Sequence, residues 1–167
     1  MRSPAVRHRI VPNLWFDTQA EEAAAFYVSV FGGDSRLTQV TRYTEAGPGP
    51  AGTVMTVEFE LDGQRFIAIN GGPRFTFDEA VSFQIDCESQ DEVDRFWELL
   101  TDGGQESMCG WLKDRYGLSW QVVPTGWEEI LNDPDPERGR RATTAMLGMR
   151  KLDIAALRAA ADGDAPA

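Results

Sequence analysis

The sequence is poor in the residues that most often bind metals or form disulfides. Its 167 residues include one histidine, His8, and two cysteines, Cys87 and Cys109. Two cysteines make no disulfide framework and their spacing fits no zinc motif, so we expect two reduced thiols, with a single bridge as the alternative. There is no run of 18 apolar residues, and no apolar core follows the basic N-terminal segment. These absences predict a cytoplasmic protein with no membrane span and no secretion signal.

Positive charge is also scarce. The chain has 16 Lys and Arg residues against 27 Asp and Glu residues, which gives a formal net charge of −11 at pH 7. Nucleic acids and anionic membranes repel an acidic surface, so we expect neither as a partner. With 42% hydrophobic and 26% charged residues, the composition is that of an ordinary globular protein. The length suits a single domain over residues 1–167.

The first half of the chain is typical of a strand, a helix and three further strands. The predicted strands cover residues 8–16, 37–43, 53–61 and 64–70. Pro12 suggests that the first strand is an edge strand or contains a bulge. Asp17 or Thr18 can cap the following helix, which ends at Gly32-Gly33. The dipeptide Asp62-Gly63 suits a tight hairpin, because both residues tolerate positive φ.

The second half repeats this pattern. Its predicted strands cover residues 81–86, 105–112 and 118–123. Ser89 or Asp91 can cap a helix that runs through Leu100. In this helix Glu92 precedes an aromatic pair, Phe96-Trp97, by four positions, and the helix of the first half has Glu22 before Phe26-Tyr27 at the same spacing. The repeat indicates an internal duplication. A single copy of the repeated unit cannot close its own sheet, so the two copies are expected to pack together.

The duplication predicts an α+β fold of two βαβββ modules that form an incomplete barrel with a central cleft. Module 1 covers residues 9–72 and module 2 covers residues 78–125. Residues 126–161 form a C-terminal helical extension, with a short helix near Trp127 and later helices that begin after Asp133-Pro-Asp-Pro136 and at Asp153. We expect this extension to provide packing or dimer surface and no chemistry.

Several segments resemble PhnB-like proteins of the glyoxalase/bleomycin-resistance/dioxygenase (vicinal-oxygen-chelate) superfamily. The segments are Asn13-Leu-Trp-Phe-Asp17, Glu21-Glu-Ala-Ala-Ala-Phe-Tyr27, Val30-Phe-Gly-Gly33, the stretch 66–73, the stretch 109–124 and the stretch 145–157. The resemblance covers about residues 9–160 and implies a homodimer. Members of this group often carry the label 3-demethylubiquinone-9 3-methyltransferase.

The residues do not support a methyl-transfer activity. A methyltransferase of the usual type needs a parallel sheet and a glycine-rich turn that opens a helix after the first strand. The glycine pairs here, at 32–33, 71–72 and 103–104, follow helices or a strand. The sequence therefore argues against the activity that the label names.

The resemblance implies a metal site with His, Glu or Gln ligands from strands of both modules. Gln121 stands where the superfamily usually has a glutamate, and Ile67 is its counterpart in module 1. The other ligand positions are expected at Ile10 or Pro12 and at Ala80 or Ser82, where only Ser82 is even a weak donor. We expect His8 to be a surface or terminal residue. The sequence therefore predicts no metal and no cofactor.

Strand alternation places Ser119, Gln121 and Val123 on one face of their strand, and Ser82 and Gln84 share a face in the same way. The residues predicted to bind a small-molecule ligand in the cleft are Gln121, Ser119, Ser82, Gln84, Asn70 and Trp111. The first hypothesis is a metal-free protein that binds a small organic molecule there. The charged run Lys113-Asp-Arg115 is predicted to be a solvated turn with local pairing.

Two other functions stay open on the sequence. One is a metal-dependent lyase, isomerase or dioxygenase, in which a divalent metal is held by Gln121, His8 and a residue from a second chain. The other is a structural or interaction module with a closed, filled cleft.

Overall fold

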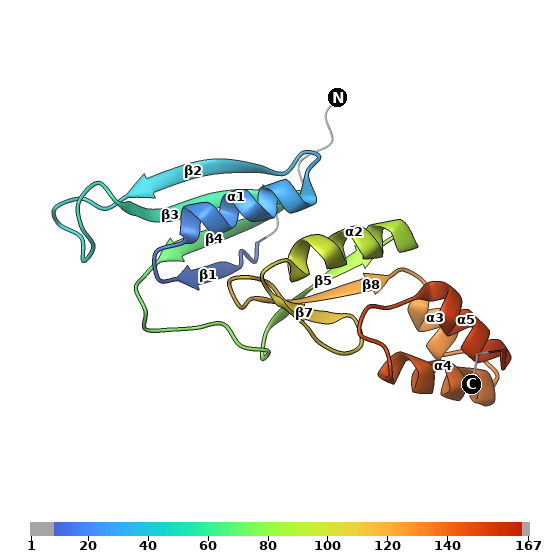
Figure 1. The fold of residues 1–167 in the computed structure, drawn as a ribbon. Helices are drawn as coiled ribbons and strands as arrows, with labels where there is room; N and C mark the ends of the chain where they lie inside the picture. The colour runs from blue at the N-terminus through green and yellow to red at the C-terminus, as the bar shows by residue number, and fades with distance from the viewer. Residues whose placement is uncertain (1–8, 165–167) are drawn as a thin grey trace, which may run out of the picture. The chain divides into compact units, whose positions relative to one another are not determined.

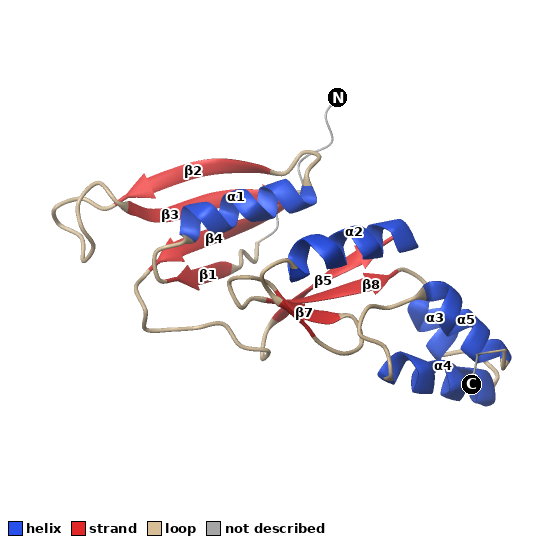
Figure 2. Ribbon diagram, in the orientation of Figure 1, coloured by secondary structure: helices blue, strands red, loops and turns tan. Residues whose placement is uncertain are grey.

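The computed structural model describes residues 9–164, so His8 lies outside the described residues. The chain divides between Thr76 and Phe77 into two compact units, and each unit is described by itself. Figure 1 traces the elements along the chain, and Figure 2 shows that each unit combines a sheet with helical structure. The division falls between the two predicted modules, beside the Gly71-Gly72-Pro73 segment.

The first unit has the predicted β-α-β-β-β order. Its elements are β1 (Asn13–Phe16), α1 (Ala20–Phe31), β2 (Arg36–Arg42), β3 (Val54–Leu61) and β4 (Gln64–Asn70). The strands lie in the order β1-β4-β3-β2, with β1 parallel to β4 and the other pairs antiparallel. This open, mixed, four-stranded sheet confirms the predicted module.

Two local predictions for the first unit are wrong. Strand β1 begins at Asn13, not at residue 8, because the proline at position 12 has no N–H to donate to a ladder. Neither Asp17 nor Thr18 caps α1; Gln19 is the N-cap residue and makes no side-chain cap bond. The turn at Asp62-Gly63 is confirmed, with φ values of 45° and 80°.

Helix α1 covers one face of the first sheet. Its small residues Ala20, Ala23 and Ala24 are fully buried and let the helix approach the strands closely. The ring of Tyr27 stacks on Phe59, which stacks on Phe66, with centroids 6.2 Å and 5.4 Å apart. Such aromatic contacts add to the stability that burial alone provides.

The second unit repeats the module. Its elements are β5 (Ser82–Cys87), α2 (Gln90–Thr101), β6 (Gln105–Glu106), β7 (Trp111–Lys113) and β8 (Ser119–Pro124). The order β5-β8-β7-β6 matches that of the first sheet, and the parallel pair is again the first strand with the last. Ser89 caps α2 by accepting from the backbone of Glu92. The predicted strand over 105–112 is divided, because Cys109 and Gly110 both have positive φ.

The prediction that Lys113-Asp-Arg115 is a solvated turn is wrong for its central residue. Asp114 is only 3% exposed. Its carboxylate accepts from the backbone N–H groups of Tyr116 and Leu118 at 2.8 Å and 3.1 Å, and from the indole N–H of Trp120 at 2.9 Å. These three donors offset the cost of removing the carboxylate from water.

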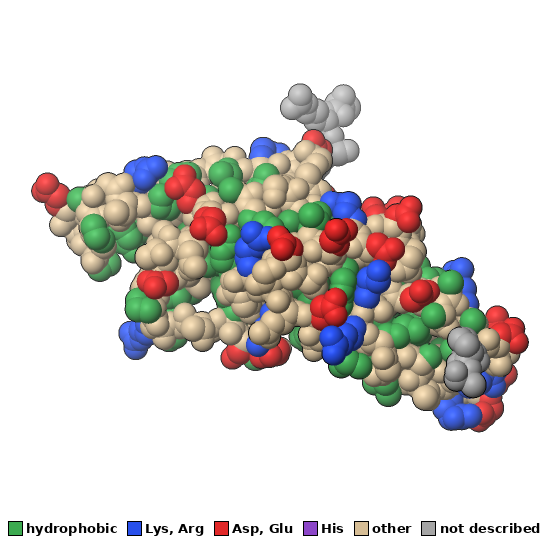
Figure 3. Space-filling model, viewed as in Figure 1, with side chains coloured by type: hydrophobic (Ala, Val, Ile, Leu, Met, Phe, Trp, Pro, Cys, Tyr) green, Lys and Arg blue, Asp and Glu red, His purple; other side chains and the backbone are tan. Residues whose placement is uncertain are grey.

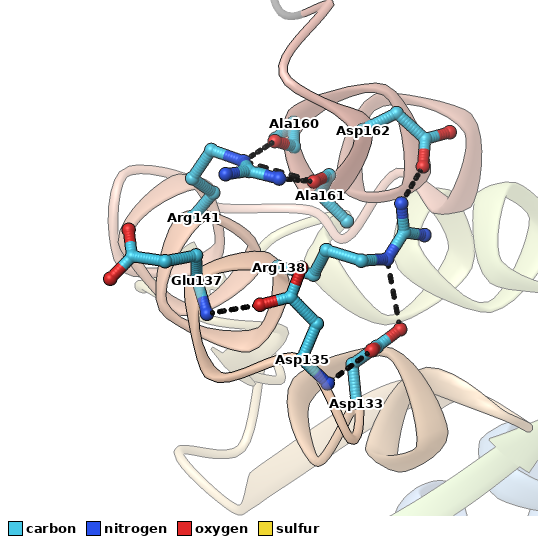
Figure 4. Close-up of polar contacts among 8 residues, drawn as sticks. All are labelled: Asp133, Asp135, Glu137, Arg138, Arg141, Ala160, Ala161 and Asp162. Carbon is cyan, nitrogen blue, oxygen red and sulfur yellow. Dashed lines mark hydrogen bonds and ion pairs between the residues drawn. The ribbon is translucent and has the colours of Figure 1, made fainter.

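Three helices form the C-terminal extension, as predicted: α3 (Trp127–Leu131), α4 (Pro136–Leu147) and α5 (Ile154–Asp162). Figure 4 shows how side chains join them. Arg138 of α4 bonds Asp133, which follows α3, at 3.0 Å, and also Asp162 at the end of α5. Arg141 donates to the carbonyl groups of Ala160 and Ala161 near the C-terminus of α5.

The extension is attached to the second module through both main-chain and side-chain groups. The N–H groups of Cys109 and Gly110 donate to the carbonyls of Met149 and Arg150 at 2.8 Å and 2.7 Å. A Cβ on Gly110 would lie 3.1 Å from the side chain of Leu152 and 2.8 Å from the carbonyl of Val122. Glycine at position 110 is therefore required for this close approach.

Both cysteines are free thiols, as predicted. Among residues 9–164, no helix is long and apolar enough to cross a bilayer. Figure 3 shows acidic and basic side chains interspersed on the face in view.

Candidate functional site

The second sheet has one face covered by α2 and a second face with polar side chains. Helix α2 contacts β5, β7 and β8, and buries Val93, Phe96, Trp97 and Leu100. Alternate strand residues such as Trp120 and Val122 are buried. The remaining alternate positions, among them Gln84 and Gln121, point to the opposite face.

Three of these side chains form a row across three strands. Gln84 of β5 is the register partner of Gln121 of β8, and Gln121 is also the partner of Trp111 of β7. We call these three residues the amide row. Register partners in a sheet point to the same face and lie about 5 Å apart. Gln121 and Trp111 are half-buried and Gln84 is exposed.

Hydrogen bonds fix both amides of the row. The Nε2 group of Gln121 donates to the hydroxyl oxygen of Ser82 at 2.8 Å. The Nε2 group of Gln84 donates to a carboxylate oxygen of Asp86 at 2.7 Å. An ionised carboxylate only accepts hydrogen bonds, so it also determines which way the Gln84 amide is turned.

A second row lies beside the first and consists of Ser82, Ser119 and Lys113. Lys113 forms an ion pair with Glu79 at 2.6 Å, and its hydrogen bond lowers the pKa of the Glu79 carboxyl. Ser119 is fully buried, and its hydroxyl donates to the carbonyl of Asp78 at 3.5 Å. A small cavity of about 120 Å³ adjoins Trp111, Lys113, Ser119 and Glu79.

The structure thus brings five of the six predicted site residues to one face of the second sheet. The sixth, Asn70, belongs to the first unit. Its Oδ1 atom accepts from the backbone of Ala20 at 2.8 Å, its Nδ2 group donates to the carbonyl of Val54 at 3.1 Å, and its own carbonyl accepts from Tyr43 at 2.7 Å. Asn70 therefore joins four parts of its own unit.

The first unit contains a larger cavity, of about 530 Å³, that the sequence did not predict. It lies between the N-terminal turn of α1, the end of β4 and the loop that joins β2 to β3. Its lining residues include Asp17, Glu21, Tyr43, Pro50 and Asn70. A Cβ atom on Gly49 would lie only 2.5 Å from the ring atoms of Tyr43, so the ring packs directly against this glycine. Residues 48–50, a glycine between two prolines, therefore form part of the cavity wall as well as of a loop.

The amide row does not fit the metal that the fold family implies. Within residues 9–164, no group of three or more His, Cys, Asp or Glu side chains is placed to hold a metal ion. The row offers amides and an indole, with a hydroxyl nearby, and these are weak donors for a transition metal. Ile67 provides no donor, and its register partner on β1 is Asn13.

A family model described as 3-demethylubiquinone-9 3-methyltransferase matches residues 8–123. This chain belongs to that family. The PhnB protein of Bacillus cereus, which carries the same methyltransferase name, is 37% identical; the alignment covers 71% of this chain and all of the other, with a TM-score of 0.64. The family match ends at residue 123, so it gives no support to the resemblance claimed for residues 145–157.

Two further solved structures share the fold of the family. Protein PA1353 from Pseudomonas aeruginosa is 23% identical, with 71% of this chain and 98% of the other covered and a TM-score of 0.58. The fosfomycin resistance protein FosX from Listeria monocytogenes is 12% identical, with 74% and 98% covered and a TM-score of 0.51. No curated protein matches this chain.

The family name describes a methyl transfer, and residues 9–164 lack the features of the usual methyltransferase fold. Each of the two sheets is mixed, with a single parallel pair. After β1 the chain reaches α1 through Asp17-Thr-Gln19, with no glycine in the connection. The glycine-rich turn that approaches a nucleotide-like methyl donor is thus missing from residues 9–164.

Proposed function

We propose that this member of the 3-demethylubiquinone-9 3-methyltransferase family binds a small organic molecule on the face of its second sheet that α2 does not cover, without a metal. The observation that supports this proposal is the amide row, Gln84, Gln121 and Trp111. An aromatic surface with a few fixed polar groups is the usual composition of a small-molecule site. The predicted position of this site in a cleft between the modules stays a prediction.

The row is prepared for binding because its polar groups already have fixed directions. Ser82 and Asp86 hold the two amides, so little side-chain freedom remains to be lost when a ligand arrives. Trp111 supplies a broad ring at low entropic cost, and the half-burial of Gln121 and Trp111 reduces competition from water. A leucine at position 84 or 121 would keep the volume and remove the hydrogen bonds.

The test is a thermal-shift screen of a small-molecule library, followed by calorimetry on each hit. We expect Gln121→Leu to weaken binding at least about tenfold, as the loss of one well-made hydrogen bond to a bound group implies. The matched control is Tyr43→Phe, which alters the wall of the larger cavity in the first unit and should leave the affinity unchanged. A hit that loses affinity with Tyr43→Phe and not with Gln121→Leu would assign binding to that cavity and contradict the proposal.

Elemental analysis after dialysis with nickel, zinc, manganese or iron(II) separates the proposal from the metal-dependent enzyme. We expect no ion to be retained, because the donors on the row are weak. About one tightly held ion per chain would favour the lyase, isomerase or dioxygenase alternative. The homodimer implied by the family resemblance stays a proposal, to be tested by sedimentation at micromolar concentration.

A further inference from the structure

We infer that the ligand of the amide row is a planar organic cation that carries N–H donors, of the amidine or guanidine type. This inference rests on the proposed function and specifies the class of molecule bound. It follows from which atoms of the row are already engaged by the protein, from the charges around the row and from the spacing of the strands.

The row presents hydrogen-bond acceptors. The amide nitrogen of Gln84 is held by Asp86, and that of Gln121 is held by Ser82. Each Oε1 atom is therefore turned away from the group that holds its amide. Because amide oxygens only accept hydrogen bonds, the complementary ligand is one that donates.

The charge near the row is negative. Asp86 lies two residues beyond Gln84 on β5, so both side chains leave the same face of the strand. Lys113 is the cation in the neighbouring row, and its ammonium group is neutralised by Glu79 at 2.6 Å. Trp111 completes the row at the β7 end, and an indole face attracts a cation more strongly than any other side-chain ring.

The spacing suits a flat group with two divergent N–H bonds. Gln84 and Gln121 are direct register partners on neighbouring parallel strands, which lie about 4.8 Å apart. The two N–H groups of an amidinium or guanidinium point away from each other at such an angle that each can reach one acceptor. Trp111, the partner of Gln121 on the other side, provides an aromatic face beside the bound cation.

The experiment uses three probes of similar size on the full chain: benzamidine hydrochloride, sodium benzoate and N,N-dimethylbenzamide. Binding is measured by calorimetry at constant ionic strength, and the side-chain amide signals of Gln84 and Gln121 are followed by NMR. We expect benzamidine to bind at least about tenfold more tightly than the other two, because only it donates N–H bonds and carries positive charge. Asp86→Asn should weaken benzamidine binding about tenfold, because it removes the negative charge near the row.

Gln84→Leu and Gln121→Leu should each weaken benzamidine binding by a similar factor. Gln39→Leu is the matched control, because Gln39 is an exposed glutamine on β2 of the first unit and its replacement should leave the affinity unchanged. Equal or tighter binding of benzoate or dimethylbenzamide, with the same dependence on Gln121, would overturn the inference and leave the proposed function standing. Binding of all three probes that is insensitive to both row glutamines would overturn the inference and the site together.

Discussion

The Oδ1 atom of Asn70 lies 2.8 Å from the backbone nitrogen of Ala20, so the last residue of β4 supplies the hydrogen bond that the start of α1 needs. The helix has no side-chain cap of its own. The same amide also donates to the carbonyl of Val54, which begins β3. One side chain thus joins the helix and two strands of the first unit.

Replacing Asn70 with alanine should therefore lower the free energy of unfolding by about 2 kcal/mol, because a helix cap and a second hydrogen bond are lost together. The measurement is urea denaturation followed by circular dichroism. Asn70→Asp keeps an acceptor for Ala20 and should cost less than the alanine variant. Equal losses for the two variants would contradict the capping role.

Asp114→Asn tests the buried carboxylate of the second unit. Asparagine can still accept from the backbone of Tyr116 and Leu118, but its amide nitrogen would face the indole N–H of Trp120, which is also a donor. We expect a loss of about 2 kcal/mol in the free energy of unfolding. Trp120→Phe should cost less stability in the Asp114→Asn variant than in the unmodified protein, because the bond between the two residues is already lost there. Additive losses would contradict the interaction.

The two thiols should differ in reactivity. Burial raises the pKa of the Cys87 thiol to about 12 from its ordinary value of 9.0, and the side chain is fully buried. At pH 8 a thiol reagent should label Cys109 in the folded protein and Cys87 only after unfolding. Mass spectrometry of the labelled peptides measures the difference, and rapid labelling of Cys87 without unfolding would contradict it.

The same shift gives a pH dependence of stability. Between pH 9 and pH 12 the unfolded chain loses the Cys87 proton while the folded chain keeps it, so the folded state binds more protons. Stability should therefore fall as the pH rises through this range. Cys87→Ala should make the alkaline decline shallower, and thermal melts at several pH values measure it.

Gln90→Leu should loosen the C-terminal extension. The Gln90 amide donates to the carbonyl of Leu152 at 3.1 Å and accepts from the backbone of Ile154 at 3.0 Å. We expect amide hydrogen exchange at Ile154 and along α5 to accelerate, while exchange in β3 and β4 of the first unit stays unchanged. Unaltered exchange in α5 would show that other contacts, such as the ion pair of Lys151 with Asp94 at 2.6 Å, are sufficient.

The repeated pattern of hydrophobic residues and turns was enough to predict both modules and the C-terminal helices. The turn at Asp62-Gly63 and the cap at Ser89 depend on neighbours in the sequence, and both predictions are confirmed. The cap of α1 depends on a residue 50 positions away. Asp17 and Thr18 were predicted as caps because only residues close in the sequence can be compared without the fold.

The candidate site shows the same division. Strand alternation placed Gln121 and Ser82 on one face, and their hydrogen bond agrees with that placement. Alternation gave no information about Asn70, whose partners lie on other elements of its unit. The burial of Asp114 could not be predicted from the sequence either, because it depends on the hydrogen bond from the indole of Trp120 across the turn.

The attachment of the C-terminal extension has an evolutionary consequence. The N–H groups of Cys109 and Gly110 hold Met149 and Arg150 through main-chain atoms, and main-chain bonds place little constraint on which side chains occur there. Substitutions should therefore be tolerated more readily at Met149 than at Arg150 and Lys151, whose side chains form ion pairs with Glu106 and Asp94. Homologues that lack the extension should still retain glycine at position 110, because its positive φ and the carbonyl of Val122 at 2.8 Å exclude a Cβ whether or not the extension is present.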